Sequence, residues 1–291
     1  MMNFLSRLNQ PQKLILDGAT GTELNRRGVD TGLPLWSANA LLNDHDATIL
    51  QQIHEDYLRA GADIITTNTF RTHRRALIPS GNAQRALELT RRAVDIAHKA
   101  ISGVPSDSPR FVAGSISTLE DCYRPDLVPA DSALRTEHSE RVHHLIECGV
   151  DLMLIETINT IREAAIIAKL AVITGVPVIV SFVCNKDGRL LSGESVTDAA
   201  RELVPLGISA IGVNCGPTPN LAKPLQELQA VCGQRFPLVA YGNIGYADDE
   251  VGWINTDSED PKAYGEHAIH WPVKIVGGCC GTTPAHIEQL K

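Results

Sequence analysis

Residues 152–183, LMLIETINTIREAAIIAKLAVITGVPVIVSFV, indicate the fold class because two apolar strands flank one helix-like stretch. The strands, Leu152–Glu156 and Val178–Val183, are short and rich in aliphatic residues. Between them, Thr160–Ile173 has the length and apolar spacing of an amphipathic helix. Strands that are apolar along most of their length are typical of a parallel sheet covered on both faces. This stretch therefore predicts a βαβ unit of an α/β protein.

The same alternation recurs along the chain. The other predicted strands are Leu14–Asp17, Asp63–Asn68, Phe111–Ser115, Ala210–Asn214, Leu238–Tyr241 and Val273–Val276. The other predicted helices are Ala47–Ala60, Ala83–Ala100, Ser132–Cys148, Val196–Leu203, Asn220–Cys232 and Pro284–Lys291, and Gly242–Pro261 is expected to be a long acidic loop. Eight such units favour a single-domain (β/α)8 TIM barrel over residues 1–291. A doubly wound open sheet is the alternative, but the first βα turn, DGATGT at residues 17–22, lacks the GxGxxG spacing of a Rossmann turn.

Composition and charge exclude several functional classes. The 291 residues are 43% hydrophobic and 21% charged, which predicts a large folded core and not a disordered chain. The formal net charge of -8 gives the chain no general attraction for nucleic acid or anionic lipid. Its longest nearly apolar run, Ala171–Cys184, is broken by Gly175 and Pro177 and is too short to span a membrane. Because Met1–Gln10 has no signal-peptide core, we expect a cytoplasmic protein.

Three of the seven cysteines follow predicted strands. Cys215 ends one strand in GVNC, residues 212–215, and Cys279 and Cys280 end another in VGGCCGTTP, residues 276–284. The carboxyl ends of all barrel strands face one mouth, so these thiols can converge there. Three thiolates at ~2.3 Å from Zn²⁺ leave one tetrahedral position open. A zinc ion bound by three thiolates is an anionic centre, and such a centre favours the activation of an incoming thiol.

Two other roles compete with a zinc site for these three cysteines. The three thiols are alternatively buried core residues, or Cys279 and Cys280 form a redox pair. A redox pair leaves Cys215 unexplained, and the glycine-rich turn has no evident packing purpose. The remaining cysteines, Cys122, Cys148, Cys184 and Cys232, are expected to be ordinary free thiols.

Several motifs together carry a family resemblance. They are DGATGTEL at residues 17–24, PLWSA at 34–38, TTNTF at 66–70, GVNC at 212–215 and GGCCGTTP at 277–284. With these motifs the chain resembles the homocysteine S-methyltransferase family. These zinc-dependent barrels also form the homocysteine module of cobalamin-dependent methionine synthase and betaine–homocysteine methyltransferase. The resemblance implies that Cys215, Cys279 and Cys280 bind zinc as the cofactor.

The resemblance also implies residues for the acceptor substrate. Asp17 and Glu156 match the acidic positions that hold the homocysteine amino group, and both end predicted strands at the barrel mouth. Structural alternatives are a turn residue for Asp17 and a helix-capping acid for Glu156. Backbone amides near Gly21 are candidates for the substrate carboxylate, and Asn214 is a candidate supporting residue beside Cys215.

The segment that is expected to contact the methyl donor departs from the family pattern. The segment TFRTHRR at residues 69–75 replaces the Ser-Tyr-Gln-Ala-Thr stretch associated with members that use S-methylmethionine. Arg71 is a candidate for a donor carboxylate, and a solvated helix start is the alternative. The aromatic residues Trp36, Tyr123 and Tyr241 are candidates for binding an onium methyl group by cation–π attraction.

From these residues we expect a zinc-dependent methyltransferase. A small cationic donor, such as S-methylmethionine or another sulfonium or onium compound, would give its methyl group to the homocysteine thiolate, forming methionine. One alternative is a non-catalytic barrel that binds zinc and thiols but has an altered donor pocket. Another is a methyltransferase whose donor is supplied by a separate protein. A zinc hydrolase is disfavoured, because its usual cluster of His and carboxylate ligands is absent from the sequence.

Overall fold

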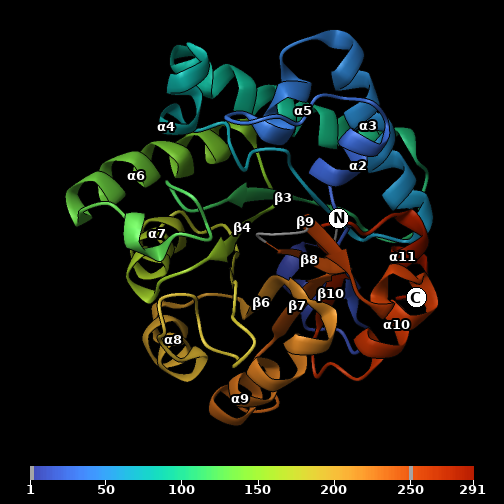
Figure 1. The fold of residues 1–291 in the computed structure, drawn as a ribbon, viewed down its shortest axis with the longest axis vertical. Helices are drawn as coiled ribbons and strands as arrows, with labels where there is room; N and C mark the ends of the chain where they lie inside the picture. The colour runs from blue at the N-terminus through green and yellow to red at the C-terminus, as the bar shows by residue number, and fades with distance from the viewer. Residues whose placement is uncertain (1–2, 249–251) are drawn as a thin grey trace.

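The computed structural model describes residues 3–248 and 252–291 and contains an eight-stranded parallel barrel. The strand order is β1, β10, β7, β6, β5, β4, β3, β2, and a parallel bridge between Leu16 and Ile64 links the two ends of the sheet. Helices surround the strands (Figure 1), so the predicted (β/α)8 barrel is confirmed. The barrel strands are β1 (Leu14–Ile15), β2 (Ile64–Thr66), β3 (Phe111–Ile116), β4 (Leu152–Ile158), β5 (Val178–Phe182), β6 (Ala210–Pro217), β7 (Leu238–Asn243) and β10 (Ile275–Gly278).

The seven predicted helices are present, with ends that differ by up to three residues. They are α3 (Asp44–Ala60), α5 (Ala86–Gly103), α6 (Asp131–Cys148), α7 (Ile161–Val172), α8 (Val196–Leu203), α9 (Ala222–Cys232) and α11 (Pro284–Glu288). Side-chain caps determine where several helices begin. The side chains of Asn43, Thr160 and Ser195 accept hydrogen bonds from backbone N–H groups in the first turns of α3, α7 and α8. No described helix combines the length and apolar character that crossing a membrane requires.

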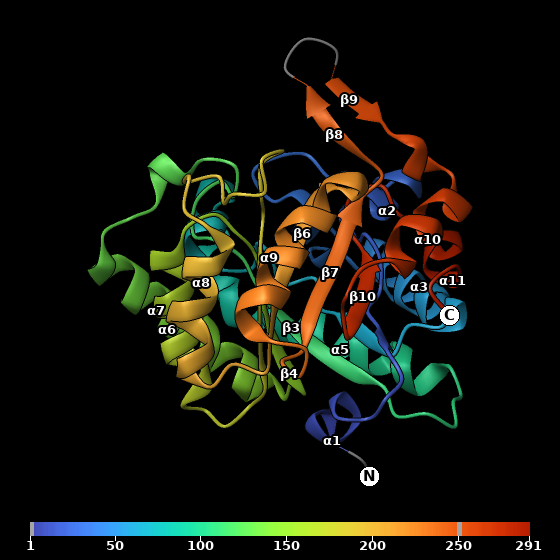
Figure 2. The ribbon, with the colours of Figure 1, turned by 90° about the horizontal axis from the view of Figure 1, so that it is seen from below.

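Among the described residues, four further α-helices were not predicted: α1 (Phe4–Leu8), α2 (Gly21–Arg26), α4 (Arg74–Leu77) and α10 (Pro261–Ile269). Most are short, so their sequences contain too few turns for a clear apolar period. Figure 2 shows α1 at the lower end of the barrel, from which the arrows of the strands point away. Phe4 packs edge-to-face on Phe111, with ring centroids 5.4 Å apart, so α1 covers the amino ends of the strands.

The core has two layers, because each strand contributes side chains to both faces. In β4, Leu152 and Leu154 point into the barrel, whereas Met153 and Ile155 pack against the surrounding helices. Both faces of β4 are buried, which explains why this strand, like the others, is apolar along most of its length.

The segment Gly242–Pro261 is not the predicted loop. It contains an antiparallel hairpin, β8 (Gly245–Asp248) and β9 (Gly252–Asn255), and its residues 249–251 lie outside the described residues. Figure 2 shows this hairpin standing above the carboxyl ends of the barrel strands. Tertiary contacts fix its base: the Ile244 N–H donates to the Cys280 carbonyl, and the Thr256 N–H donates to the Ile244 carbonyl. The sequence around the turn lacks the usual two-residue hairpin signal, which explains the wrong prediction.

Candidate metal and substrate site

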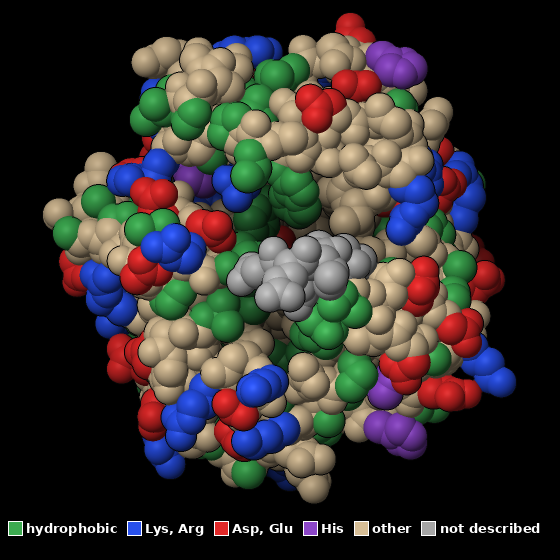
Figure 3. Space-filling view, viewed as in Figure 1, with side chains coloured by type: hydrophobic (Ala, Val, Ile, Leu, Met, Phe, Trp, Pro, Cys, Tyr) green, Lys and Arg blue, Asp and Glu red, His purple; other side chains and the backbone are tan. Residues whose placement is uncertain are grey.

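A cavity of about 340 Å³ opens at the carboxyl ends of the barrel strands. Figure 3 shows a hollow in this face that is surrounded by hydrophobic side chains. All but one of the sequence-predicted site residues line the cavity: Asp17, Gly21, Trp36, Arg71, Tyr123, Glu156, Cys215, Tyr241, Cys279 and Cys280. The barrel therefore brings together residues that are as far apart in sequence as Asp17 and Cys280.

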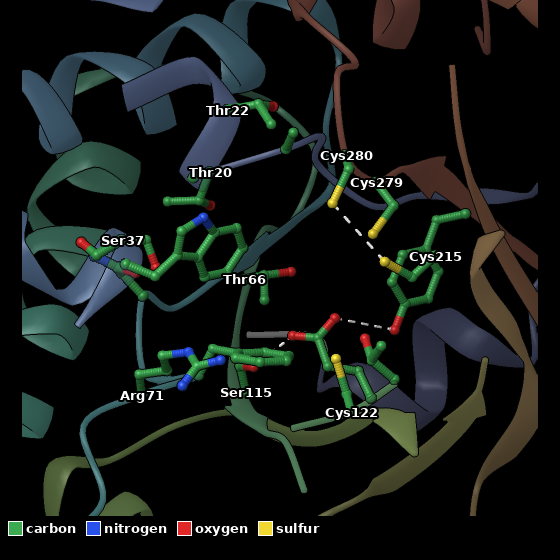
Figure 4. A pocket seen from close by; sticks show the side chains of 18 of the residues that line it. Thr20, Thr22, Ser37, Thr66, Arg71, Ser115, Cys122, Cys215, Cys279 and Cys280 are labelled. Carbon is green, nitrogen blue, oxygen red and sulfur yellow. Dashed lines mark hydrogen bonds between the residues drawn. The ribbon is translucent and has the colours of Figure 1, made fainter. Parts of the chain in front are cut away.

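Three cysteine thiols converge at one side of this cavity (Figure 4). The sulfur atoms of Cys215, Cys279 and Cys280 all lie within 4.8 Å of one another, and those of Cys215 and Cys280 are 3.8 Å apart. Two sulfur ligands at ~2.3 Å from a tetrahedral ion would be separated by about 3.8 Å. The donor set and its spacing thus fit a soft or borderline metal ion such as Zn²⁺.

Backbone irregularities aim the thiols at this point. Cys215 has a φ of 55°, and the register of β6 against β7 shifts between Asn214 and Pro217. After β10, Gly281 adopts a φ of +85°, and a Cβ there would lie 2.4 Å from the Ile244 side chain. A regular strand would point neighbouring cysteines to opposite faces, so the turn allows Cys279 and Cys280 to reach one ion.

Hydrogen bonds determine how charge is shared among the thiols. The pKa of Cys215 is held well below its usual range, chiefly by hydrogen bonds from the Cys279 and Cys280 thiols. The pKa values of Cys279 and Cys280 are raised, first because each hydrogen-bonds to Cys215. The Tyr123 hydroxyl lies 3.1 Å from the Cys215 sulfur. In the metal-free cluster, negative charge is therefore favoured on Cys215 over the other two thiols.

Two buried carboxyl groups lie in the same cavity. Asp17 accepts hydrogen bonds of 2.8 Å from both the backbone N–H and the hydroxyl of Thr66. Glu156 accepts from the Ser115 hydroxyl, and from the Tyr241 hydroxyl at 3.3 Å. Burial raises the pKa of Asp17 to about 8 and that of Glu156 to about 7. Among the described residues, no Lys or Arg forms an ion pair with either group, so the pair can accept a cation from outside the protein.

Asn214 is the predicted site residue that does not line the cavity. Its amide oxygen accepts from the Thr157 N–H at 3.0 Å, and its amide nitrogen donates to the Thr157 hydroxyl at 2.8 Å. Thr157 follows Glu156 and has a φ of 56°. Asn214 therefore braces the backbone next to Glu156, and β4 and β6 are joined behind the site.

The remaining predicted residues form the cavity wall. Trp36 packs edge-to-face on Phe70, with ring centroids 5.8 Å apart. A Cβ at Gly21 would lie 2.3 Å from the Trp36 ring, so glycine is needed where the ring approaches. Tyr241 is buried, whereas Tyr123 is about half exposed and has its hydroxyl at the cysteine cluster.

Thr66, Ser115 and Cys122 are among the lining residues that were not predicted as site residues from the sequence. Thr66 lies within the TTNTF motif, which gave a signal for it. Ser115 ends a predicted strand without any distinguishing pattern. Cys122 is buried and free, as expected of an ordinary thiol, yet it lines the cavity without joining the group of three sulfurs.

Comparisons with known proteins agree on one family. The family model described as homocysteine S-methyltransferase matches residues 14–291. The chain is 31% identical to homocysteine S-methyltransferase of Escherichia coli K12, over 98% of this chain and 96% of the relative. It is 30% identical to selenocysteine Se-methyltransferase of Brassica oleracea var. italica, over 95% of this chain and 87% of the relative. Among solved structures, the metallated form of the Escherichia coli homocysteine methyltransferase MmuM superposes with a TM-score of 0.84, at 29% identity and 98% coverage of each chain.

Proposed function

The chain belongs to the homocysteine S-methyltransferase family and is a methyltransferase, and on this premise we propose that it is a zinc enzyme. It transfers a methyl group from a small cationic donor, such as S-methylmethionine or another onium compound, to the thiolate of homocysteine, forming methionine. Residues 1–291 act as one homocysteine-binding domain. The observation that carries the proposal is the convergence of three thiols in a cavity that also holds two buried carboxyl groups.

Cys215, Cys279 and Cys280 would hold the zinc ion. When bound there, zinc supplies a fourth position at which the pKa of a substrate thiol falls to near neutral. A zinc ion with three thiolate ligands would be a weak Lewis acid, because the ligands are anionic. Such an ion favours activation of a thiol over polarisation of a carbonyl.

Asp17 and Glu156 would bind the homocysteine ammonium group. Both carboxyl groups are buried and held by hydrogen bonds, so they are oriented before the substrate arrives. An ammonium group would favour their ionised forms and so lower their raised pKa values. Binding at this end fixes the acceptor, so that its sulfur points toward the cysteines.

The donor would enter against the aromatic wall formed by Trp36, Tyr123 and Tyr241. A cationic methyl donor gains cation–π attraction of ~0.5–2 kcal/mol from such rings. The homocysteine sulfur attacks the methyl carbon in line, and the electron pair of the breaking bond returns to the donor heteroatom, which leaves neutral. The largely apolar cavity excludes water from the thiolate, so the chain's task is alignment rather than proton transfer.

The first test compares two cysteine variants. Cys280→Ala should lose bound zinc and nearly all methyl transfer, because only two thiol ligands remain. Cys122→Ala is the matched control, since Cys122 is buried in the same cavity but lies outside the three-sulfur group. Zinc content is measured by elemental analysis, and methionine formation by mass spectrometry with a panel of onium donors.

The outcomes separate the proposal from its alternatives. Full zinc content in Cys280→Ala would remove that residue from the ligand set. Zinc and homocysteine binding without turnover of any donor would favour a non-catalytic barrel or a donor supplied by a separate protein. Undiminished turnover after chelation of all metal would contradict a zinc enzyme.

A further inference from the structure

Three arginines after β2 differ in their partners. Arg74 pairs with Glu140, and Arg75 pairs with both Glu120 and Glu137. Arg71 lines the cavity instead, and no described carboxylate lies within ion-pairing distance of it. Its Nε atom is buried without a hydrogen-bond partner. Because the guanidinium lines the cavity without an acidic partner among the described residues, a ligand carboxylate that reaches its Nη atoms would be favoured.

The backbone that carries Arg71 is held firmly. The carbonyl of Phe70 accepts hydrogen bonds from the Ser117 hydroxyl at 2.7 Å and from the buried Arg141 guanidinium at 3.5 Å. On the other side of Arg71, the hydroxyls of Thr72 and Thr90 lie 2.7 Å apart within hydrogen-bonding distance. The guanidinium therefore projects from a fixed position, which lowers the entropic cost of binding an anion.

The charges of the cavity are separated. The described lining residues include three carboxyl groups, those of Asp17, Asp121 and Glu156, together with the three-thiol cluster. Arg71 is the one Lys or Arg among these lining residues. Figure 4 shows Arg71 across the cavity from Cys279 and Cys280. If the homocysteine sulfur lies at the cysteines and its ammonium at Asp17 and Glu156, Arg71 remains for the second substrate.

The position of Arg71 also favours the donor. It directly follows Phe70, whose ring packs on Trp36 in the aromatic wall that suits an onium group. A donor whose cationic end lies on this wall can place an anionic group beside the guanidinium. Guanidinium binds carboxylate through paired, charge-assisted hydrogen bonds, a geometry that a lysine cannot reproduce.

We propose that Arg71 is a specificity-determining residue that binds a carboxylate of the methyl donor, so that this chain selects onium donors which carry one. The inference rests on the proposed function, because it assigns one group within the same reaction. It concerns only the recognition of the donor.

Matched pairs of substrates test this assignment. S-Methylmethionine and 3-(dimethylsulfonio)propionate are each compared with the same cation lacking the carboxylate, (3-aminopropyl)dimethylsulfonium and ethyldimethylsulfonium. Homocysteine is likewise compared with 3-aminopropane-1-thiol, which lacks the acceptor carboxylate. Each pair is measured with the zinc-loaded wild type, Arg71→Gln, Arg71→Lys and the control Arg74→Gln, whose surface ion pair lies outside the cavity.

Arg71→Gln should lower kcat/KM about 10- to 100-fold for donors with a carboxylate, mainly through KM, and leave their counterparts within about twofold. Arg71→Lys should recover part of the loss, and Arg74→Gln should match the wild type. Melting temperature and zinc content confirm that each variant is folded and loaded. Equal losses for both members of a donor pair, no loss, or a loss that follows the homocysteine carboxylate would each overturn the assignment.

Calorimetry without homocysteine separates this inference from the proposed function. If no donor is turned over, binding of 3-(dimethylsulfonio)propionate to the wild type but not to Arg71→Gln would still support the carboxylate site. Absence of binding to the wild type, or equal binding to both proteins, would overturn it.

Discussion

At the scale of single residues, two buried carboxyl groups and three thiols share one cavity, and no described Lys or Arg forms an ion pair with either carboxyl group. Each carboxyl group has only neutral hydrogen-bond donors, from Thr66, Ser115 and Tyr241. Burial therefore favours their protonated forms, and a metal ion and an ammonium group would reverse that preference. The proposed cationic ligands would therefore be favoured at this site, at the expense of the stability of the unliganded protein.

Glu156→Gln tests this balance through the pH dependence of stability. The pKa of Glu156 is raised from its ordinary value of 4.5 to about 7, so its neutral form contributes stability that is full below about pH 4.5. That contribution is lost as pH rises through 7. Between pH 4 and pH 8, the unfolding free energy of the metal-free wild type should fall relative to the variant by on the order of 3 kcal/mol.

Urea unfolding at several pH values measures this difference. Homocysteine binding should weaken in the same variant, because one carboxylate partner of its ammonium is lost. Parallel pH profiles for the two proteins would show that Glu156 does not titrate in this range.

Site residues whose chemistry is unusual for their local sequence could be predicted without the structure. A vicinal pair of cysteines in a glycine-rich turn has few structural explanations, so Cys279 and Cys280 stood out. Asn214 also stood out through its neighbour Cys215, yet its amide bonds to Thr157, a contact across two strands that no local pattern encodes. Ser115 gave no signal, because a serine at a strand end is common and its partner Glu156 is 41 residues away.

At the scale of elements, two interrupted strands support each other. Strand β4 shifts register between Ile155 and Ile158, and β6 shifts between Asn214 and Pro217. The Asn214 side chain joins the two irregularities through Thr157. This contact between Asn214 and Thr157 therefore connects the backbone beside Cys215 with the backbone beside Glu156.

Asn214→Ala should lower the unfolding free energy by about 1–3 kcal/mol, because the buried Thr157 N–H loses its acceptor. It should also raise KM for homocysteine, since the backbone beside Glu156 is no longer held. Urea denaturation and steady-state kinetics measure the two effects. Asn39→Ala is the control, as its amide makes a longer bond of 3.4 Å to Gly32 in an exposed position. Equal effects in both variants would contradict a bracing role for Asn214.

Helices and strands could be predicted where burial produces a repeating apolar pattern. They could not be predicted where tertiary contacts determine the local structure. The first four residues of β4, Leu152–Ile155, are apolar because both faces of the strand are buried, so the sequence alone reveals this part of the strand. The β8–β9 hairpin depends on the contact of Ile244 with Cys280 and has no apolar alternation of its own. Its acidic, glycine-containing sequence is equally compatible with a loop.

At the scale of the whole molecule, the barrel determines which distant residues meet. The eight barrel strands run parallel, so their carboxyl ends lie around one mouth. The cavity at this mouth is therefore lined by residues from both halves of the chain. The sequence predicted this gathering because the βα alternation implies it. The orientation of each side chain within the cavity depends on the bulges and turns, and that part required the structure.

The metal site should also stabilise the barrel. Cys215 belongs to β6, whereas Cys279 and Cys280 follow β10, and β7 lies between these strands. An ion held by all three would therefore tie together strands that share no hydrogen bonds, and it would bind the folded chain more tightly than the unfolded chain. Free zinc at 1,000 times its dissociation constant would add about 4 kcal/mol to the unfolding free energy.

Chelation should accordingly lower the melting temperature of the wild type by several degrees, as measured by calorimetry with and without a strong chelator. Cys215→Ala should melt near the temperature of the chelated wild type and should not respond to the chelator. Cys232→Ala, at the end of α9 and outside the three-sulfur group, should respond as the wild type does. A chelator response that persists in Cys215→Ala would place the stabilising ion elsewhere, because that variant lacks the one thiol that joins β6 to the turn after β10.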